Sequence, residues 1–477
     1  MIGFLGADIG TTGTKTMLFD GNDNAVGRGY KGYNLYTPFE GAYEQDAEDW
    51  YLSLKQSIID AVKDSDLDIK AISLSSQGGS FFLADIVDGK IIPLCRALTW
   101  MDVRAEKEFE EAKQEISPDQ VYRITGWRMG RGSAICRLRW LKKHQPEIFA
   151  KTKIILSTAD YIYYRLTGKL VIDYSSAAMM GMFNVSDAKW DEKLTSVAGV
   201  SEELLPKLVP TGECLGEILP DVAKDLGLKN GVMLYSGAHD QYAASLGSNY
   251  FSKNDLVIST GTTWVLFGNS EKPVFNDYYL APGKHPAGGY GVIVSAVSSG
   301  TVMEWTKNFL AVDFKTLDEE AEKRAVDKDL LVYPFISGGG GYRGKNKLSY
   351  SVVGGAMRHD KFDIARATME GVAFEIKKII SIYRASGINE DRIIVSGGAA
   401  RSRVWMEILS SVLEKEVYIS NQSDRTCFGA FSIAKKGYLG GDYKKFEFDG
   451  YTISPKEQLV PSYREKYLNY EERFNRT

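Results

Sequence analysis

The chain has 477 residues, a length that at about 150 residues per domain predicts two to four domains. Hydrophobic residues make up 44% of the chain and charged residues 25%, which excludes a disordered or fibrous protein. The formal net charge of −4 gives no general attraction to nucleic acid or to an anionic membrane, so we expect neither as a partner.

Cysteine and histidine are placed in ways that argue against disulfides and against a His/Cys metal site. The four cysteines are far apart and form no CxxC pair, which favours a reduced setting. The four histidines show neither HxxxH nor HExxH spacing. The first residues lack the basic region of a signal peptide, and no apolar run reaches the roughly 18 residues of a membrane span. We therefore expect a cytoplasmic protein.

The N-terminal pattern predicts a strand, a tight turn and a second strand. Residues 2–7 are nearly all apolar, residues 10–13 are Gly-Thr-Thr-Gly, and residues 16–19 resume an extended pattern. Residues 47–62 then carry apolar side chains at steps of three and four after Asp46, which predicts a capped amphipathic helix.

Short apolar strands alternate with helical patterns along the rest of the chain, which predicts an α/β fold. Residues 364–380 are typical of a second amphipathic helix, and residues 393–395 of a strand that runs into a Ser-Gly-Gly-Ala-Ala turn. The tail after Pro455 is polar with Tyr/Leu spacing, which indicates a closing helix.

One internal echo is present. The Gly-Thr-Thr of residues 10–12 recurs at residues 261–263, each time between two apolar strands. Gly-Thr turns are common, so chance and gene duplication explain this echo equally well by itself.

Gly-Thr turns expose consecutive backbone N–H groups and a hydroxyl, a combination that binds phosphate oxygens. Before the first turn, Asp8 is placed where its carboxylate could face Mg²⁺, a cation that needs few protein carboxylates, and Lys15 follows within reach. The alternative is a hairpin tip with a capping aspartate. The turn at residues 396–400 is a third candidate, where glycines would let a ribose or flat ring approach the backbone; the alternative is a plain helix-entry turn.

The glycine-rich segment 339–345 resembles two nucleotide-binding motifs, and we reject both. It satisfies GxGxxG and nearly GxxxxGK, but Asn346 stands where a magnesium-binding Ser or Thr is required, and a strand pattern follows instead of a helix.

Asp240 is the best candidate for acid–base chemistry because it follows a strand and a short loop at a helix entry. That position would keep it ionised and able to accept a hydrogen bond from a substrate hydroxyl; the alternative is a plain N-cap. Trp100, Asp102 and Arg104 offer an aromatic face and polar groups to a polyhydroxylated ligand, or else form a buried tryptophan with a capping aspartate.

In their order, these elements resemble the FGGY carbohydrate kinases of the actin-like ATPase superfamily. The resemblance runs from about residue 3 to about residue 435. The segments that carry it are GADIGTTGTK at 6–15, EQDAEDW at 44–50, SQG at 76–78, WMDVR at 100–104, GAHDQ at 237–241, STGT at 259–262, GTVMEW at 300–305, GVAF at 371–374, SGGA at 396–399 and FGA at 428–430.

The resemblance implies two duplicated ribonuclease-H-like α/β domains flanking a deep cleft, with a boundary that we place between residues 242 and 243. It implies ATP-dependent phosphorylation of a small sugar or polyol, with Asp240 as the catalytic base and Asp8 holding the Mg²⁺ of MgATP. The nucleotide-binding residues that we expect are Thr11, Thr12, Lys15, Gly261, Thr262, Gly300, Glu304, Gly397, Gly398, Ala399 and Ser402. The expected substrate-binding residues are Gln77, Gly78, Trp100, Asp102, Asp240 and Gln241.

The chain looks most like the xylulokinases, so D-xylulose is the leading substrate, with another ketose, a polyol or a sugar acid as alternatives. Those enzymes carry a Met-His pair after the glutamine equivalent to Gln77, whereas this chain has Gly78-Gly79, which implies a roomier pocket or a contact supplied elsewhere. Arg128 and Arg131 could supply that contact to an acid sugar, or could be solvated surface residues.

A non-kinase, filament-forming or chaperone-like ATPase of the same superfamily is the alternative of a different class. Trp100, Asp102 and Asp240 argue against it, since a pure ATPase would not need them. A homodimer is left open.

Overall fold

The computed structural model describes residues 1–248, 254–296, 299–336, 338, 341–343, 348–422, 424–443 and 449–475. The chain forms two compact units, of which the first comprises Met1–Tyr250, Pro282–Gly291 and Asp424–Phe446. The second comprises Phe251–Ala281, Val292–Ser423 and Glu447–Thr477. The units are defined by contacts and are not separated by a single cut, so the boundary at residues 242–243 stays a prediction about the two sequence halves. The expected cleft likewise stays a prediction.

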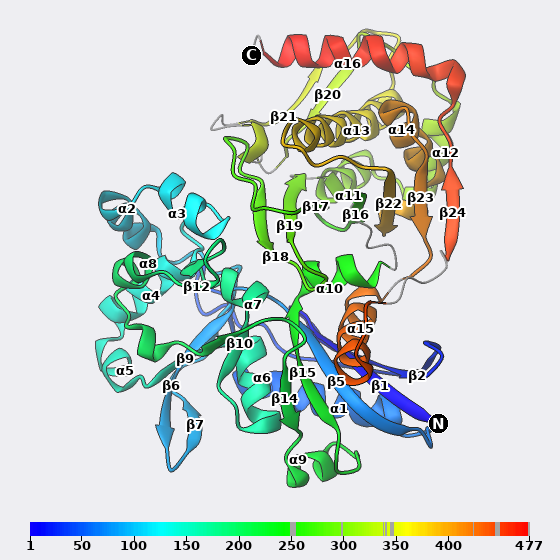
Figure 1. Cartoon of the computed structure of the whole chain (residues 1–477). Helices are drawn as coiled ribbons and strands as arrows, with labels where there is room; N and C mark the ends of the chain where they lie inside the picture. The colour runs from blue at the N-terminus through cyan, green and yellow to red at the C-terminus, as the bar shows by residue number, and fades with distance from the viewer. Residues whose placement is uncertain are drawn as a thin grey trace. The chain divides into compact units, whose positions relative to one another are not determined.

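The first unit is built on a six-stranded sheet in the order β14-β15-β5-β1-β2-β3 (Figure 1). Strands β1, β2 and β3 are antiparallel neighbours, whereas β5 and β15 continue the sheet in parallel with β1. The bounds are Ile2–Ile9 for β1, Gly13–Asp20 for β2, Ala25–Gly32 for β3, Asp68–Ser76 for β5, Cys214–Glu217 for β14 and Met233–His239 for β15.

The second unit repeats this strand order. Its sheet contains the order β19-β17-β16-β22-β23-β24, in which β16 and β17 form an antiparallel hairpin and β22 and β23 run parallel to β16. The bounds are Asp255–Thr260 for β16, Trp264–Ser270 for β17, Tyr290–Ala296 for β19, Arg392–Gly397 for β22, Val417–Ser420 for β23 and Gly450–Ile453 for β24. The hairpins β1–β2 and β16–β17 hold the same place in their sheets, and both carry a Gly-Thr-Thr tip. The internal echo therefore coincides with a repeated topology, which favours duplication over chance.

The first amphipathic helix forms where its pattern predicts it, as α1 (Ala47–Val62). The Asp46 side chain accepts a hydrogen bond from the backbone N–H of Glu48, and Trp50, Leu54 and Ile58 are fully buried. Because the cap and the apolar stripe are both local, the chain specifies this helix without help from distant segments.

Most of the remaining elements of the first unit come from the part of the chain that follows β5 and precedes β15. A second sheet has the order β4-β8-β6-β7, with β9 paired to β6. The bounds are Glu44–Gln45 for β4, Phe81–Val87 for β6, Lys90–Pro93 for β7, Ala97–Leu98 for β8, Ile154–Ser157 for β9, Val171–Asp173 for β10, Phe183–Asn184 for β11, Lys189–Trp190 for β12 and Lys207–Val209 for β13. The helices are α2 (Glu106–Glu115), α3 (Pro118–Thr125), α4 (Ala134–His144), α5 (Pro146–Lys151), α6 (Thr158–Thr167), α7 (Tyr174–Ala178), α8 (Glu192–Ala198), α9 (Pro220–Asp225) and α10 (Asp240–Gly247).

Helix α15 (Arg425–Leu439) belongs to the first unit although it lies near the end of the chain. Phe431 of this helix makes an edge contact with Phe4 of β1, and Phe428 makes one with Phe19 of β2. These buried aromatic contacts place the N-terminal residues of α15 beside the first Gly-Thr turn.

The second unit carries its helices around the repeated sheet, and its two longest predicted helices are present. They are α13 (Lys361–Ala385) and the closing helix α16 (Val460–Phe474). The other elements are α11 (Ser299–Leu310), α12 (Phe314–Lys323), α14 (Arg403–Leu413), β20 (Leu331–Pro334) and β21 (Tyr350–Val353), and β18 (Ala281–Lys284) lies on the segment where the chain passes between the units. Within the described chain, no helix combines the length and the apolar character that a membrane span needs.

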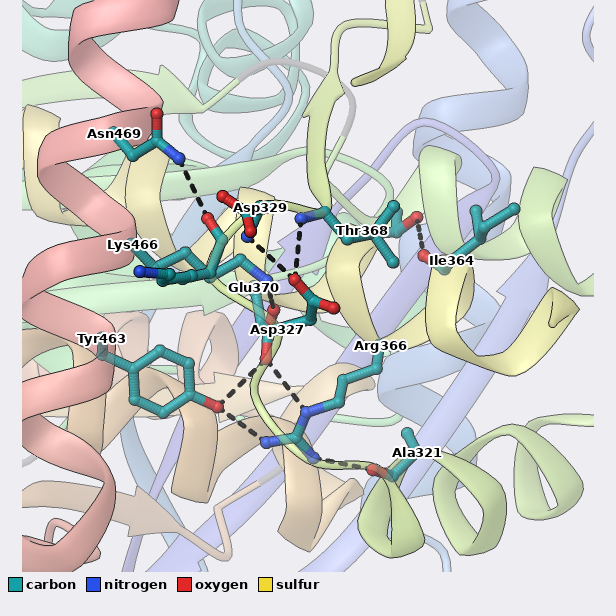
Figure 2. A network of polar contacts seen from close by, with 12 residues as sticks. Ala321, Asp327, Asp329, Ile364, Arg366, Thr368, Glu370, Tyr463, Lys466 and Asn469 are labelled. Atoms are coloured by element: carbon teal, nitrogen blue, oxygen red, sulfur yellow. Dashed lines mark hydrogen bonds and ion pairs between the residues drawn. The ribbon is translucent and has the colours of Figure 1, made fainter. Parts of the chain in front are cut away.

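A buried polar network fixes α16 against α13 (Figure 2). Arg366 donates hydrogen bonds to Glu370 at 2.9 Å, to the Tyr463 hydroxyl at 2.8 Å and to the Ala321 carbonyl at 2.7 Å. The Lys466 ammonium pairs with the other Glu370 oxygen. Each buried charge therefore has an opposite partner, which is the condition under which charges persist in a protein core.

The rejected glycine-rich motif lies largely beyond what can be described, since residues 337, 339, 340 and 344–347 are outside the described residues. Arg343, a described residue within this segment, pairs with Glu375 and Glu471 through its guanidinium.

Candidate active site

The first Gly-Thr turn joins β1 to β2, and Asp8 stands opposite Lys15 in the ladder just before it. One Asp8 oxygen, Oδ2, accepts a hydrogen bond of 2.9 Å from the Thr426 hydroxyl. The other, Oδ1, is buried and accepts no hydrogen bond from any described residue. Burial and the nearby Asp240 carboxylate raise the pKa of Asp8 to about 6, because both disfavour its negative charge. The turn therefore presents a carboxylate oxygen that a cation could use.

Lys15 does not pair with Asp8. Its ammonium lies 2.5 Å from Asp424, which also pairs with Arg28 at 3.1 Å. Asp424 and Thr426 come from the start of α15, more than 400 positions along the chain from Asp8. No spacing rule could have predicted these two residues, because only the packing of α15 brings them to the turn.

Asp240 is the first residue of α10, and the N-cap position is held by His239. The side chain of Asp240 caps no backbone N–H, so the plain N-cap alternative is wrong. Its Oδ1 is buried, lies 3.2 Å from Nε2 of His239 and accepts no well-aligned hydrogen bond from a described residue, although the side chain keeps 31% of its exposure. Because the Asp240 carboxylate raises the pKa of Asp8, the two carboxylates lie within electrostatic range of each other. Each of the two acids thus has one buried oxygen that accepts no well-aligned hydrogen bond from a described residue.

Trp100 and Gln77 lie close to this turn. The half-exposed Trp100 donates from its indole N–H to the Thr11 hydroxyl at 3.1 Å. The Gln77 amide donates to Gln45 at 2.7 Å, and Gln45 donates to the Thr11 carbonyl at 2.7 Å. Residues predicted for the sugar are therefore linked by hydrogen bonds to the turn predicted for phosphate. Gln45 makes this link, and in the sequence it stood out only as part of the family segment at residues 44–50.

Asp102 is fully buried, and its carboxylate is already engaged. It accepts from the Tyr43 backbone N–H at 2.8 Å and pairs with Arg104 at 2.7 Å, and Arg104 also pairs with Glu44. In this structure Asp102 holds neighbouring segments together, and its contact with a sugar stays a prediction.

The space beside Gly78 is not empty. A Cβ at this position would lie 2.4 Å from Cδ2 of His239 and 2.5 Å from Cγ of Met179. The expectation of a roomier pocket is therefore wrong at Gly78, because the ring of His239 takes the room that a side chain there would need. Gln241 follows Asp240 in the first turn of α10 and is partly exposed.

The two arginines proposed as partners for an acid sugar contact surface carboxylates instead. Arg128 lies 3.2 Å from Asp119, and Arg131 lies 3.2 Å from Glu106. Their side chains keep 36% and 59% of their exposure, in agreement with the surface interpretation.

A cavity of about 670 Å³ lies within the second unit, a size typical of small-molecule sites. Seven predicted nucleotide residues line it, namely Gly261, Thr262, Gly300, Glu304, Gly398, Ala399 and Ser402. The lining residues that sequence reasoning missed are Thr260, Thr301, Met303, Phe314, Lys315, Asp318, Met369, Arg401 and Trp405. Thr260, Thr301 and Met303 belong to quoted family segments, whereas the others lie outside them and only the fold identifies them.

The floor of this cavity is made where two glycine turns meet. The Thr260 hydroxyl donates to the Ser396 carbonyl at 2.8 Å, and the N–H of Gly398 donates to the Thr260 carbonyl at 3.0 Å. Gly397 has a φ of 105°, and a Cβ there would lie 2.6 Å from the Thr260 carbonyl oxygen. Gly397 is thus required for the turn and does not itself line the cavity.

Asp318 gives the cavity a partly buried acidic group. Its Oδ1 accepts a hydrogen bond of 2.8 Å from the Ser402 hydroxyl, and burial raises the pKa of Asp318. Trp405 donates from its indole to the Met369 carbonyl at 3.1 Å, which fixes an aromatic wall. The cavity therefore combines apolar faces with a few oriented polar groups.

We expect Gly300→Ala to distort this cavity. The new Cβ would lie 2.1 Å from the Gly261 carbonyl oxygen, so α11 and the second Gly-Thr turn must separate. Forced overpacking of this kind costs about 1–3 kcal/mol in the free energy of unfolding, and we expect the affinity for ADP to fall several-fold. Chemical denaturation and ADP titration measure both effects. Gly355→Ala is the matched control, since nothing lies within 4 Å of its added Cβ; equal behaviour of the two variants would contradict the packing argument.

The two halves of the chain match the two domains of one sequence family. Residues 3–247 match the N-terminal domain, and residues 256–436 the C-terminal domain, of the FGGY family of carbohydrate kinases. The chain therefore belongs to the FGGY family of carbohydrate kinases. It is an enzyme, a phosphotransferase that acts on an alcohol group, and membership implies ATP as the phosphoryl donor. The non-kinase alternative is set aside.

Among curated relatives, the gluconokinase of Bacillus subtilis is 30% identical over 96% of this chain and 93% of its own length. The xylulose kinase of the same organism is 24% identical over 99% of this chain and 97% of its own length. A solved structure, the xylulose kinase of Lactobacillus acidophilus, superposes with a TM-score of 0.91 at 24% identity, over 100% of this chain and 98% of that chain. The expected two-domain α/β fold of the actin-like ATPase type is confirmed.

Proposed function

We propose that this carbohydrate kinase transfers the γ-phosphoryl group of ATP to a hydroxyl of a small neutral sugar, with D-xylulose as the leading acceptor and Asp240 as the base. The observation that carries the proposal is the partly exposed carboxylate of Asp240, which lies within electrostatic range of Asp8. A substrate hydroxyl that reached the exposed part of this carboxylate would donate a hydrogen bond to it.

Phosphoryl transfer passes through a loose transition state, so positioning and charge neutralisation matter more than strong base chemistry. Asp240 would accept the hydrogen bond of the sugar hydroxyl, orient its oxygen toward the γ-phosphorus and take its proton late in the transfer. Trp100 offers a half-exposed indole against which the carbon face of the sugar could stack. Thr11 and Thr12 would contact phosphate oxygens, and the paired Lys15 would add positive charge nearby.

Asp8 fits a magnesium site. Its Oδ1 is open, and Mg²⁺ takes one or two carboxylates together with water and phosphate oxygens. In the described part of the chain no group of three or more His, Cys, Asp or Glu side chains is arranged to hold a metal. When bound, Mg²⁺ would neutralise phosphate charge.

The nucleotide is assigned to the cavity of the second unit. Its apolar walls, with Trp405 and Met303, suit a flat base, and the carboxylate of Asp318 suits a ribose or amino donor. The Gly398 N–H is bonded to the Thr260 carbonyl, so the phosphate contacts that we propose come from the remaining N–H groups and the hydroxyls of the turns that carry Gly261 and Gly398.

The acceptor is assigned from the charge of the first unit. Asp8 and Asp240 are both acids, and Arg128 and Arg131 contact surface carboxylates, so the surroundings favour a neutral ketose over an anion. Gluconate is the second candidate, because relatives at 30% and 28% identity are gluconokinases.

ADP release in a coupled assay with MgATP tests the proposal. The panel comprises D-xylulose, L-xylulose, D-gluconate, glycerol and a no-sugar reaction. We expect D-xylulose to give the largest stimulation. Stimulation by gluconate alone would replace the acceptor and keep the mechanism, whereas equal rates without sugar would contradict sugar phosphorylation. The cytoplasmic setting and a homodimer remain predictions.

A further inference from the structure

We infer that His239 is a positioning residue for Asp240, and that Gly78 is required because the His239 ring takes the place of a side chain at position 78. The inference rests on the proposed function, since it assigns a role beside the proposed base. It adds a residue pair to the specificity of that site.

The backbone of His239 is held in place by a buried chain of hydrogen bonds. Its N–H donates to the Ser175 hydroxyl at 2.9 Å, and Ser175 donates to Asp173 at 2.6 Å. Asp173 in turn caps α7 through the backbone N–H groups of Ser175 and Ser176. His239 also ends β15, in register with Ser76 of β5. The Cα–Cβ direction of His239 is therefore set by two elements.

Packing, and not hydrogen bonding, sets the position of the ring. The side chain keeps 8% of its exposure, and Nδ1 is buried with no hydrogen-bond partner among the described residues. A Cβ at Gly78 would lie 2.4 Å from Cδ2 and 2.8 Å from Nε2 of this ring, where contacts under 3.0 Å require a shift. The ring of Tyr242 meets it edge-on, with centroids 6.0 Å apart. Removing the hydrogen at Gly78 in favour of a methyl group therefore has to move the ring.

The ring edge that Gly78 confines is the edge that faces Asp240. Nε2 lies 3.2 Å from Oδ1 of Asp240, which leaves the exposed part of the carboxylate to the substrate hydroxyl. An imidazole nitrogen at this distance limits rotation of the carboxylate, as an orienting group does for a base. Gly78 thus confines the His239 ring, and the ring in turn limits the position of the Asp240 carboxylate.

The first test replaces His239. We expect His239→Ala to lower kcat with D-xylulose on the order of 10- to 100-fold, because misplacement of a catalytic group by about 1 Å costs about 100-fold. D-gluconate is used as acceptor if the panel identifies it instead. KM for MgATP should stay within about twofold, and His239→Gln, whose amide can reach the same carboxylate oxygen, should recover part of kcat.

His144→Ala is the matched control. The Nε2 of His144 also lies 3.2 Å from a carboxylate, that of Glu108, but on α4 and outside the proposed site. We expect its kinetics to equal those of the unmodified chain. Thermal melts of every variant separate loss of folding from loss of positioning.

The second test is a double-mutant cycle between Gly78→Ala and His239→Ala. Alone, Gly78→Ala should lower kcat as His239→Ala does. In the His239→Ala background the collision with the ring is gone and only the one with Cγ of the flexible Met179 side chain remains, so the same methyl group should cost less and the two effects should be non-additive.

Unchanged kcat in both His239→Ala and Gly78→Ala, or strictly additive effects on kcat, would overturn the inference. Asp240→Asn is measured in parallel. If it is inactive while the His239 variants behave like the unmodified chain, the inference alone fails. If Asp240→Asn is fully active, the proposed function fails first.

Discussion

Asp240→Asn is expected to lower kcat for sugar phosphorylation by about 10²- to 10⁴-fold, the range that a positioned general base contributes. Asparagine keeps the size and the hydrogen-bonding carbonyl of the side chain but cannot take the hydroxyl proton. Because transfer depends mainly on positioning, a residual rate above that of the no-sugar reaction is expected. The assigned nucleotide cavity lies in the other compact unit, so the affinity for ADP should be unchanged. Steady-state kinetics and ADP titration measure the two quantities.

Asp221→Asn is the control for this substitution. Asp221 also lies in the first turn of a short helix, α9, but it is exposed and belongs to no proposed site. A kcat of Asp240→Asn within about twofold of the control would refute the assignment of the base. A loss of ADP affinity equal to the loss of kcat would point to misfolding, which a melting curve identifies.

Asp8→Asn is expected to give a protein that is more stable at neutral pH and nearly inactive. The folded-state pKa of Asp8 is about 6, above the ordinary value of 3.8, so the folded chain binds this proton more tightly than the unfolded chain. Ionised Asp8 therefore opposes folding. The penalty is absent below about pH 4, grows as the pH rises between these two pKa values, and is complete above about pH 6.

Asparagine carries no such penalty. The free energy of unfolding of Asp8→Asn, relative to the unmodified chain, should therefore rise by about 2.4 kcal/mol between pH 4 and pH 7.5, with roughly half of that rise present at pH 5. Urea denaturation at the three pH values measures the change, and comparison within one variant cancels any constant effect of the amide. Sugar phosphorylation should fall at least as far as in Asp240→Asn, since the carboxylate proposed for Mg²⁺ is lost. The same stability difference at every pH would contradict the assigned pKa shift.

A gain in stability that accompanies a loss of activity would identify Asp8 as a functional group kept at a cost to folding. General damage to the fold predicts the opposite sign. Asp221→Asn serves again as the control, because an exposed acid on α9 should show neither change.

Much of the fold could be predicted from the sequence, because its signals are local. Helix α1 appears over residues 47–62 as its cap and apolar stripe predict, and α16 appears in the tail after Pro455. The Gly-Thr-Thr echo also has a local cause, since a tight turn between two strands requires small residues at its tip. The repeated sheet order then explains why the echo occurs twice.

Other features could not be predicted in this way. Thr426 and Asp424 reach the first turn only because α15 packs its phenylalanines on β1 and β2. Asp318 carries no motif, and it becomes part of a cavity only when α12 lies beside the turn that contains Ser402. The glycine turns indicated which kind of ligand the second unit would bind. They did not indicate that a cavity exists there.

By itself the sequence determined the helices α1, α13 and α16, the two Gly-Thr turns between strands and the resemblance to the FGGY family, since hydrophobic period, caps and turn residues act over a few positions. Tertiary structure alone decided which side chains meet: it raised the pKa of Asp8 by enclosing it near Asp240, and it placed the His239 ring against Gly78. These effects depend on burial and on contacts between segments that are far apart in the chain. Their strength follows from distance and solvent exclusion, and neither quantity is written in the order of the residues.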